Sequence, residues 1–392
     1  MNIGLALSGG GFRATVFHLG VLARLAEENR LEDVTFISTV SGGSLCAGLV
    51  YAQSNWGWPS SDHFKSVVAP QVRELLTTQD LQLGLIERAL RNPLNIFETR
   101  ADDLSTLMRE RWGVTARLRD LAEQPRWLIN ATCYETGKNW RFERFRMGDY
   151  RFGYTHDTNL PLSDALAASA GFPGLIGALP LDTHFYSWFK YADKSKELDE
   201  PTDPGDDLRR VTEPVTPAFP KVHLWDGGVY DNLGLEGLHN FITGWREGVD
   251  FLMVSDASGK SKPEAYQPGW RALYRIITGV MMDQIRSLRS RAVMEQMVVH
   301  KRPGGFFQIG NTCQDVLEGS PKKDEAAQLC PQCLSPEEAR RAANMETVIR
   351  KLTQEEYERL FRHGFEVADY TLYAYYSDQF KFIGYGNSRW GK

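Results

Sequence analysis

The sequence has few cysteines and no excess of basic charge. Five cysteines among 392 residues are too sparse, and odd in number, for a disulfide framework, so they favour a reducing compartment. Lys and Arg total 45 against 50 Asp and Glu, which gives a net charge of −5. A dedicated nucleic-acid binder would normally present a basic face. The composition therefore excludes a disulfide-stapled secreted domain and argues against a nucleic-acid partner.

Long apolar runs suited to a membrane span are also missing. Residues 34–61 and 165–181 are uncharged, but the first contains a Ser-Gly-Gly-Ser turn and becomes polar in its second half. The second contains two prolines and is shorter than the roughly 20 apolar residues that a spanning helix needs. The first residues carry no basic leader. We therefore expect a cytoplasmic protein without a transmembrane helix.

Strand, glycine-rich turn and helix follow one another twice near the start of the chain. Residues 3–7 and 34–40 are short β-rich apolar runs, and helical patterns follow over residues 12–28 and 45–52. This repeat is typical of an α/β fold with a parallel central sheet.

Three regions follow from the rest of the sequence. Residues 192–219 are rich in Asp, Glu, Lys and Pro, which predicts a mobile surface insertion. The motifs described below all lie within residues 1–260, which we expect to form the core. We expect residues 261–392 to form a helical C-terminal extension packed on that core.

The first glycine-rich turn is Ser-Gly-Gly-Gly-Phe-Arg-Ala over residues 8–14. Backbone N–H groups in such a turn can point together at an anion, in front of the following helix. Two interpretations compete. Gly9–Gly11 could open a dinucleotide fingerprint or form an oxyanion hole for acyl transfer. A dinucleotide site needs an acidic residue at the end of the second strand. Glu32 and Asp33 precede that strand and Ser41 stands at its end, which weakens the dinucleotide interpretation.

The second turn is Ser-Gly-Gly-Ser at residues 41–44. A nucleophile elbow places a serine on a sharp strand-to-helix turn with small neighbours, and Gly42 and Gly43 meet that need. Thr39 departs from the pattern, which has glycine at this position. Alone, the turn also fits a plain helix start with Ser41 as its cap.

The third turn is Asp226-Gly227-Gly228 after a strand candidate. A carboxylate at the end of a strand could act as general base for a serine. Asp-Gly is equally a common hairpin turn.

Taken in order, the three turns resemble the motifs of the patatin-like phospholipase family and the related cytosolic phospholipase A catalytic domains. The segment Ala-Ser-Ala-Gly-Phe-Pro-Gly at residues 168–174 is similar to a fourth motif of that family. The resemblance covers residues 1–260. It implies a three-layer α/β/α sandwich with a mostly parallel sheet and a Ser–Asp dyad. The implied reaction is hydrolysis of a phospholipid or lysophospholipid acyl ester, with no metal or other cofactor.

The resemblance also implies a role for each matching residue. Ser41 is the nucleophile that forms an acyl-enzyme, and Asp226 takes its proton and later activates water. The backbone N–H groups of Gly10 and Gly11, with Gly9 as a further candidate, hold the oxyanion. Arg13 fixes the loop or meets the substrate phosphate. The remaining glycines of the motifs support the turns: Gly42, Gly43, Gly227 and Gly228.

The expected partner is a membrane lipid, contacted peripherally. Residues 184–191 contain five aromatic side chains beside the predicted insertion, and Trp188 and Phe189 are candidates for membrane contact, with a core edge as the alternative. Two other functions stay open: a non-catalytic lipid-binding protein and a dinucleotide-dependent oxidoreductase. An activator is not indicated by any motif.

Histidine and cysteine give no clear signal of their own. None of the eight histidines is marked as a triad member. Cys313, Cys330 and Cys333 include a C-x-x-C pair, but a structural zinc site usually has a second pair. We therefore expect free thiols, with zinc as the alternative.

Overall fold

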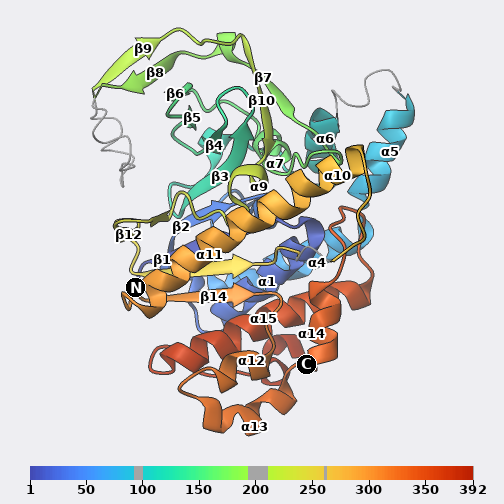
Figure 1. The fold of residues 1–392 in the computed structure, drawn as a ribbon, viewed down its shortest axis with the longest axis vertical. Coiled ribbons are helices and arrows are strands. Elements are labelled where there is room, and N and C mark those ends of the chain that lie inside the picture. The colour runs from blue at the N-terminus through green and yellow to red at the C-terminus, as the bar shows by residue number, and fades with distance from the viewer. Residues whose placement is uncertain (92–99, 193–210, 260–262, 392) are drawn as a thin grey trace.

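A mixed β-sheet forms the centre of the computed structural model, which describes residues 1–91, 100–192, 211–259 and 263–391 (Figure 1). The strands are β1 (Ile3–Leu7), β2 (Val34–Thr39), β3 (Arg126–Cys133), β4 (Lys138–Phe142), β5 (Met147–Asp149), β6 (Gly153–Thr155), β7 (Leu179–Asp182), β8 (Trp188–Tyr191), β9 (Thr212–Val215), β10 (Lys221–Asp226), β11 (His239–Asn240), β12 (Gly244–Trp245), β13 (Phe251–Asp256) and β14 (Gly304–Gln308). All of them except the small pair β11–β12 belong to one sheet.

The helices of the described residues surround this sheet. They are α1 (Gly11–Glu27), α2 (Gly42–Ala52), α3 (Ser61–His63), α4 (Ala69–Thr78), α5 (Leu81–Arg91), α6 (Arg100–Trp112), α7 (Leu162–Ser169), α9 (Gly228–Asp231), α10 (Trp270–Arg275), α11 (Met282–Val298), α12 (Cys313–Glu318), α13 (Ala326–Leu329), α14 (Pro336–Ala343) and α15 (Gln354–Tyr376). A π-helical segment, η7 (Ile276–Met281), joins α10 to α11. None of the described helices is both long and apolar enough to cross a membrane.

The parallel part of the sheet carries the motifs. Its strands lie in the order β14-β13-β1-β2-β3, and each neighbouring pair is parallel. Beyond β3 the sheet continues through antiparallel strands, beginning with the β3–β4 hairpin. Because the carboxyl ends of parallel strands meet at one edge, the turns after β1 and β2 come together there. The predicted repeat of strand, turn and helix is confirmed.

Side-chain alternation along the strands produces two separate cores. Leu5 and Leu7 of β1 belong to a large cluster that includes residues of α1, α2 and α15. Ala6, between them, packs in a second cluster with Val293 of α11. Successive side chains point to opposite faces of a strand, so helices cover both faces of the sheet. Figure 1 shows α10 and α11 crossing the sheet on the near side. The predicted α/β/α sandwich is confirmed.

The last third of the chain is built into this sandwich. Besides its helices, this region contributes the strand β14, which extends the sheet beside β13, and α15 packs along α1. A Cβ atom on Gly20 of α1 would lie 2.0 Å from Phe361 O, and one on Gly364 of α15 would lie 2.0 Å from Phe17 O. The two helix backbones therefore approach each other as closely as glycine allows.

The predicted insertion at residues 192–219 lies mostly outside the described residues. In its described part, residues 212–215 form β9, which pairs antiparallel with β8. The end of this segment is therefore an exposed strand at the surface.

Candidate active site

Ser41 stands on a strained turn between β2 and α2. Its backbone has φ 50° and ψ −116°, a conformation that non-glycine residues rarely adopt and that is common at functional sites. The two following glycines allow this turn to pack closely against the backbone of β1 and of the first glycine-rich turn. A Cβ atom on Gly42 would lie 2.3 Å from Gly11 O, and one on Gly43 would lie 2.3 Å from Leu7 O. The turn has the geometry of a nucleophile elbow and touches the first glycine-rich turn directly.

A chain of buried hydroxyl groups holds this turn. The Ser41 N–H donates to Ser169 Oγ at 3.0 Å, and Ser169 Oγ lies 2.8 Å from Ser44 Oγ. Ser44 Oγ is in turn 2.8 Å from Thr39 Oγ1, which accepts a hydrogen bond from Trp127 Nε1 at 2.9 Å. Thr39 stands where the elbow pattern has glycine. Its hydroxyl belongs to the hydrogen-bonded chain that holds the turn, and glycine has no hydroxyl to contribute.

Asp226 ends β10 and is almost completely buried, at 1% exposure. Its Oδ1 accepts a hydrogen bond from the Gly228 N–H at 2.7 Å. Its Oδ2 is buried and has no hydrogen-bond partner in the described part of the chain. Burial raises the pKa of Asp226 to about 7, opposed by the Gly228 N–H and by the Ser41 hydroxyl. The Ser41 hydroxyl therefore lies close to this carboxyl, although no ordinary hydrogen bond joins them.

The segment at residues 168–174 links the two loops. Besides the contact from Ser169 Oγ to the Ser41 N–H, its backbone carbonyls accept hydrogen bonds from the Asp226 loop. The Asp226 N–H donates to Gly171 O at 3.1 Å, and the Gly227 N–H donates to Ser169 O at 3.2 Å. Ser169 thus bonds to the backbone of Ser41 and of Gly227, the residue after Asp226, a role that the sequence analysis did not assign. The sequence signal for this role was the place of Ser169 in the fourth motif, residues 168–174.

The first glycine-rich turn lies against Ser41. A Cβ atom on Gly9 would be 3.1 Å from Ser41 Cβ. Gly10 and Gly11 have φ values of 144° and 57°, which glycine adopts without strain. Neither of their N–H groups donates to an acceptor within the described residues. The Gly9 N–H, by contrast, donates to Asn232 O at 3.0 Å. Gly9 is therefore corrected from a candidate oxyanion donor to a structural position.

Asn232 is a second residue that the sequence analysis left without a role. Besides accepting from Gly9, it donates from Nδ2 to Ser258 Oγ at 2.8 Å. A Cβ atom on Gly9 would lie 2.3 Å from Asn232 Oδ1, and one on Gly228 would lie 2.4 Å from the same oxygen. It therefore fills the space between the first and third glycine-rich turns. No local pattern marks it, since its contacts depend on residues far away in sequence.

Arg13 supports the loop. Its side chain is buried, and it donates from Nε to Ala257 O at 3.2 Å and from Nη1 to Met345 O at 2.6 Å. Burial lowers its pKa to about 10, partly offset by the negative charge of Asp256. Arg13 was predicted to fix the loop or to meet the substrate phosphate, and these contacts favour the first role.

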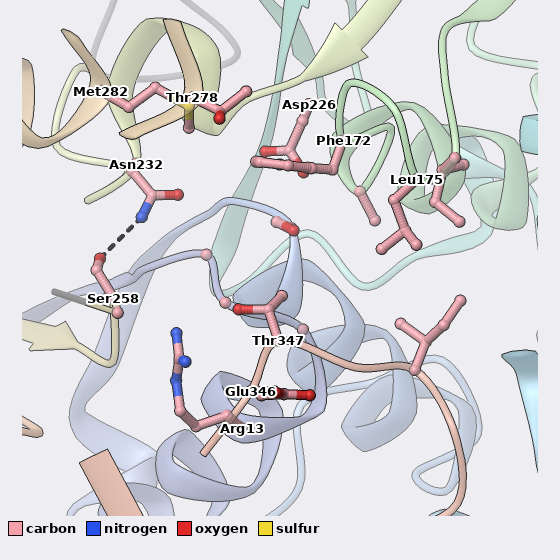
Figure 2. Close-up of a pocket in the computed structure, with 18 of the residues that line it drawn as sticks. Arg13, Phe172, Leu175, Asp226, Asn232, Ser258, Thr278, Met282, Glu346 and Thr347 are labelled. Atoms are coloured by element: carbon pink, nitrogen blue, oxygen red, sulfur yellow. Dashed lines mark hydrogen bonds between the residues drawn. The ribbon is translucent and has the colours of Figure 1, made fainter. Parts of the chain in front are cut away.

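These groups surround a cavity of about 600 Å³ that contains Ser41 and Asp226. One part of its lining is apolar and another is polar, and Figure 2 shows Phe172 and Leu175 on one side and Asn232 and Ser258 on the other. The apolar lining residues include Leu45, Leu104, Phe172, Leu175, Ile176 and Ile349, and the polar ones include Asn232, Ser258 and Arg286. No histidine of the described residues lines this cavity.

The C-terminal third closes one side of the cavity. Glu346 and Thr347, between α14 and α15, reach its lining (Figure 2). The Phe12 N–H donates to Val348 O at 2.9 Å, so this segment also fixes the start of α1. Residues beyond the expected core thus take part in the site.

Of the two candidates for membrane contact, Trp188 lies in the core and Phe189 is partly exposed. Trp188 is buried and lies edge-to-face on Phe152 at 4.8 Å and against Trp140 at 5.7 Å between ring centroids. The hypothesis that Trp188 contacts a membrane is wrong because the ring fills the core. Phe189 is half-buried and stacks on His156.

The C-terminal cysteines converge without forming a metal site. Cys313 Sγ lies 3.0 Å from Cys330 Sγ, and Cys313, Cys330 and Cys333 are all free thiols. Within the described ranges, no group of His, Cys, Asp or Glu is arranged to hold a metal ion. The structure thus offers no support for the zinc alternative.

The sequence matches the patatin-like phospholipase family over residues 5–239, and the chain belongs to this family. No curated protein sequence matches it significantly. The structure is similar to human GIVD cytosolic phospholipase A2, with 14% identity and a TM-score of 0.50 over 95% of this chain and 61% of the human chain. The complex of that human enzyme with methyl gamma-linolenyl fluorophosphonate matches with 14% identity and a TM-score of 0.50, over 94% of this chain and 56% of that one.

At this identity the structural match shows the fold alone. The chain spans about three fifths of the human enzyme that it matches. Family membership argues against the dinucleotide interpretation of the first glycine-rich turn.

Proposed function

We propose that the protein is a lipid acyl hydrolase of the phospholipase A or lysophospholipase type. The observation that carries this proposal is the pairing of Ser41, on a strained turn, with the buried carboxyl of Asp226. A carboxyl with a pKa of about 7 is suited to accept and return a proton near neutral pH. Family membership supports a lipid ester as the substrate.

The proposed reaction begins with attack of Ser41 Oγ on the ester carbonyl carbon while Asp226 Oδ2 takes the hydroxyl proton. The N–H groups of Gly10 and Gly11 stabilise the negative oxygen of the tetrahedral intermediate. The carbon–oxygen bond to the lipid alcohol then breaks, and the alcohol leaves with the proton from Asp226. An acyl-enzyme on Ser41 remains.

Water completes the cycle by the same route. Asp226 takes a proton from water as the water oxygen attacks the acyl carbon. The second tetrahedral intermediate collapses, the fatty acid leaves, and the proton returns to Ser41 Oγ. The proposed steps use a serine, a carboxyl group and backbone N–H groups, and no step requires a metal or nucleotide.

The cavity lining supports an amphipathic substrate. The apolar side, which includes Leu104 and Leu175, suits an acyl chain, whereas Asn232 and Ser258 can hydrogen-bond the glycerol or headgroup. We propose a phospholipid or lysophospholipid at a membrane surface as the substrate, contacted peripherally from the cytoplasm. A lipid-binding protein without turnover is the alternative.

Labelling with a long-chain fluorophosphonate tests the proposal, because the reagent reacts with an activated serine. We expect mass spectrometry to find the adduct on Ser41 in the wild type and none in Ser41→Ala. Ser258→Ala, which removes a different serine from the same cavity, should still be labelled. An unlabelled wild type, or an adduct on another serine, would contradict the assignment.

A further inference from the structure

An unusually exposed apolar segment lies beside the cavity. Neither α10 nor η7 contains a buried residue. Their large apolar side chains instead face solvent: Trp270 at 76% exposure, Leu273 at 45%, Ile276 at 49%, Ile277 at 42%, Val280 at 46% and Met281 at 53%. We call these six residues the apolar ridge. Contiguous exposed apolar surface of this kind marks a site of interaction.

The apolar ridge borders the mouth of the cavity. Tyr274, Thr278 and Met282, from the same continuous helix, line the cavity itself, and Figure 2 shows Thr278 and Met282 at its edge. The Tyr274 hydroxyl donates to Pro173 O at 3.4 Å. Leu175, two residues further on, lines the cavity and is 38% exposed. Apolar surface therefore continues from the ridge to the cavity wall.

The chemistry of this segment suits a lipid–water interface. Trp270 and Tyr274 have large amphipathic rings, which favour the boundary between headgroups and acyl chains. Arg271 is exposed on the same helix, and Arg275 is paired with Glu264 at 2.8 Å. The exposed Arg271 beside this apolar face favours binding to a surface that carries phosphate groups.

We propose that the apolar ridge is the surface with which the protein lies on a phospholipid bilayer. This inference rests on the proposed function, because it supplies the route by which a lipid enters the cavity. With the ridge in the bilayer, an acyl chain reaches Leu175 and the interior without crossing water. A second copy of the chain on the ridge would instead cover the cavity mouth.

Vesicle binding tests this surface directly. The probe is a vesicle of equimolar phosphatidylcholine and phosphatidylglycerol, and the protein carries Ser41→Ala so that the lipid is not consumed. We expect the triple variant Trp270→Ser, Leu273→Ser, Ile277→Ser to bind at least about tenfold more weakly, since burying even one such side chain is worth that factor.

A matched control removes exposed apolar side chains that do not line this cavity. Phe241, Ile242 and Val299 are 57%, 89% and 66% exposed, and their triple serine variant should bind vesicles as the parent does. Because the ridge is already exposed, the ridge variant should keep the parent melting temperature. Equal binding by the ridge variant and its parent would overturn the inference.

Activity measurements separate this inference from the proposed function. With Ser41 intact, the ridge variant should hydrolyse a soluble short-chain ester at the wild-type rate but lose vesicle hydrolysis. Wild-type hydrolysis of vesicles by the ridge variant would overturn the inference and leave the proposed function standing. A wild type that hydrolyses neither substrate, yet binds vesicles through the ridge, would contradict the function alone. A dimer that the ridge substitutions dissociate, with vesicle binding unchanged, would make a second copy the occupant.

Discussion

The backbone N–H of Ser41, on its strained turn, donates to a side-chain oxygen. That contact comes from Ser169 Oγ, which the hydroxyl groups of Ser44 and Thr39 hold in turn. Strain of this kind persists only where the surroundings enforce it. Ser169 is thus a positioning residue for the elbow.

Removing this contact should change the rate of the chemical step rather than substrate binding. We predict that Ser169→Ala lowers kcat by about 10²-fold, the cost of a small misplacement of reacting groups, with KM nearly unchanged. Ser169→Thr, which keeps the hydroxyl, should recover part of the loss. The control is Ser163→Ala on the same helix, whose hydroxyl bonds to Ser105 Oγ at 2.9 Å instead. A rise in KM with unchanged kcat would contradict the positioning role.

The carboxyl of Asp226 should set the pH dependence of the reaction. Burial raises its pKa to about 7, and the carboxylate form is the one that accepts the serine proton. We therefore predict that kcat/KM for a soluble ester rises through about pH 7 and levels off above it. Asp226→Asn should be nearly inactive at every pH. A profile that falls as pH rises through 7 would exclude Asp226 as the base.

At the scale of elements, two glycines allow the backbones of α1 and α15 to cross in close contact. Gly20 and Gly364 face the opposite backbones with no room for a Cβ atom. α1 begins at Gly11, within the first glycine-rich turn.

A methyl group at this crossing should destabilise the fold. We predict that Gly364→Ala lowers the free energy of unfolding by about 1–3 kcal/mol, as overpacking a core typically does. Gly386→Ala is the control, because a Cβ atom there meets nothing within 4 Å. Chemical denaturation compares the two variants. Equal stability of Gly364→Ala and wild type would show that the helices can move apart at no cost.

The sequence predicted those parts of the site that depend on local patterns. A strand followed by glycines and a helix is a local feature, so the turns around Ser41, Gly10 and Asp226 could be found. The use of the Gly9 N–H by Asn232 O could not be found, because those residues meet only through the folded sheet. The membrane contact predicted for Trp188 was wrong for the same reason, because its burial depends on Trp140 and Phe152, which are distant in sequence.

At the scale of the whole molecule, buried histidines make the stability of the folded state depend on pH. His18 and His363 are fully buried, and burial lowers the pKa of each to about 4. Between that value and the ordinary 6.5, the unfolded chain binds protons that the folded chain does not. The stability present above about pH 6.5 is therefore lost progressively as the pH falls toward 4.

We predict that the melting temperature falls between pH 6.5 and pH 4, and that His363→Gln reduces the slope. Glutamine can still donate to Ile309 O, the present partner of His363 Nε2 at 2.7 Å, but it does not titrate. His300→Gln, at an exposed position, should follow the wild type. A slope that His363→Gln leaves unchanged would remove this histidine as a source of the acid sensitivity.

The central claim is that Ser41 carries out acyl transfer from a lipid. The most direct test is release of fatty acid from a mixed phospholipid extract by the wild type and by Ser41→Ala. We predict release by the wild type and a rate lower by about 10⁴–10⁶-fold in Ser41→Ala, as loss of a nucleophile typically causes. Release by Ser41→Ala at the wild-type rate would contradict the account.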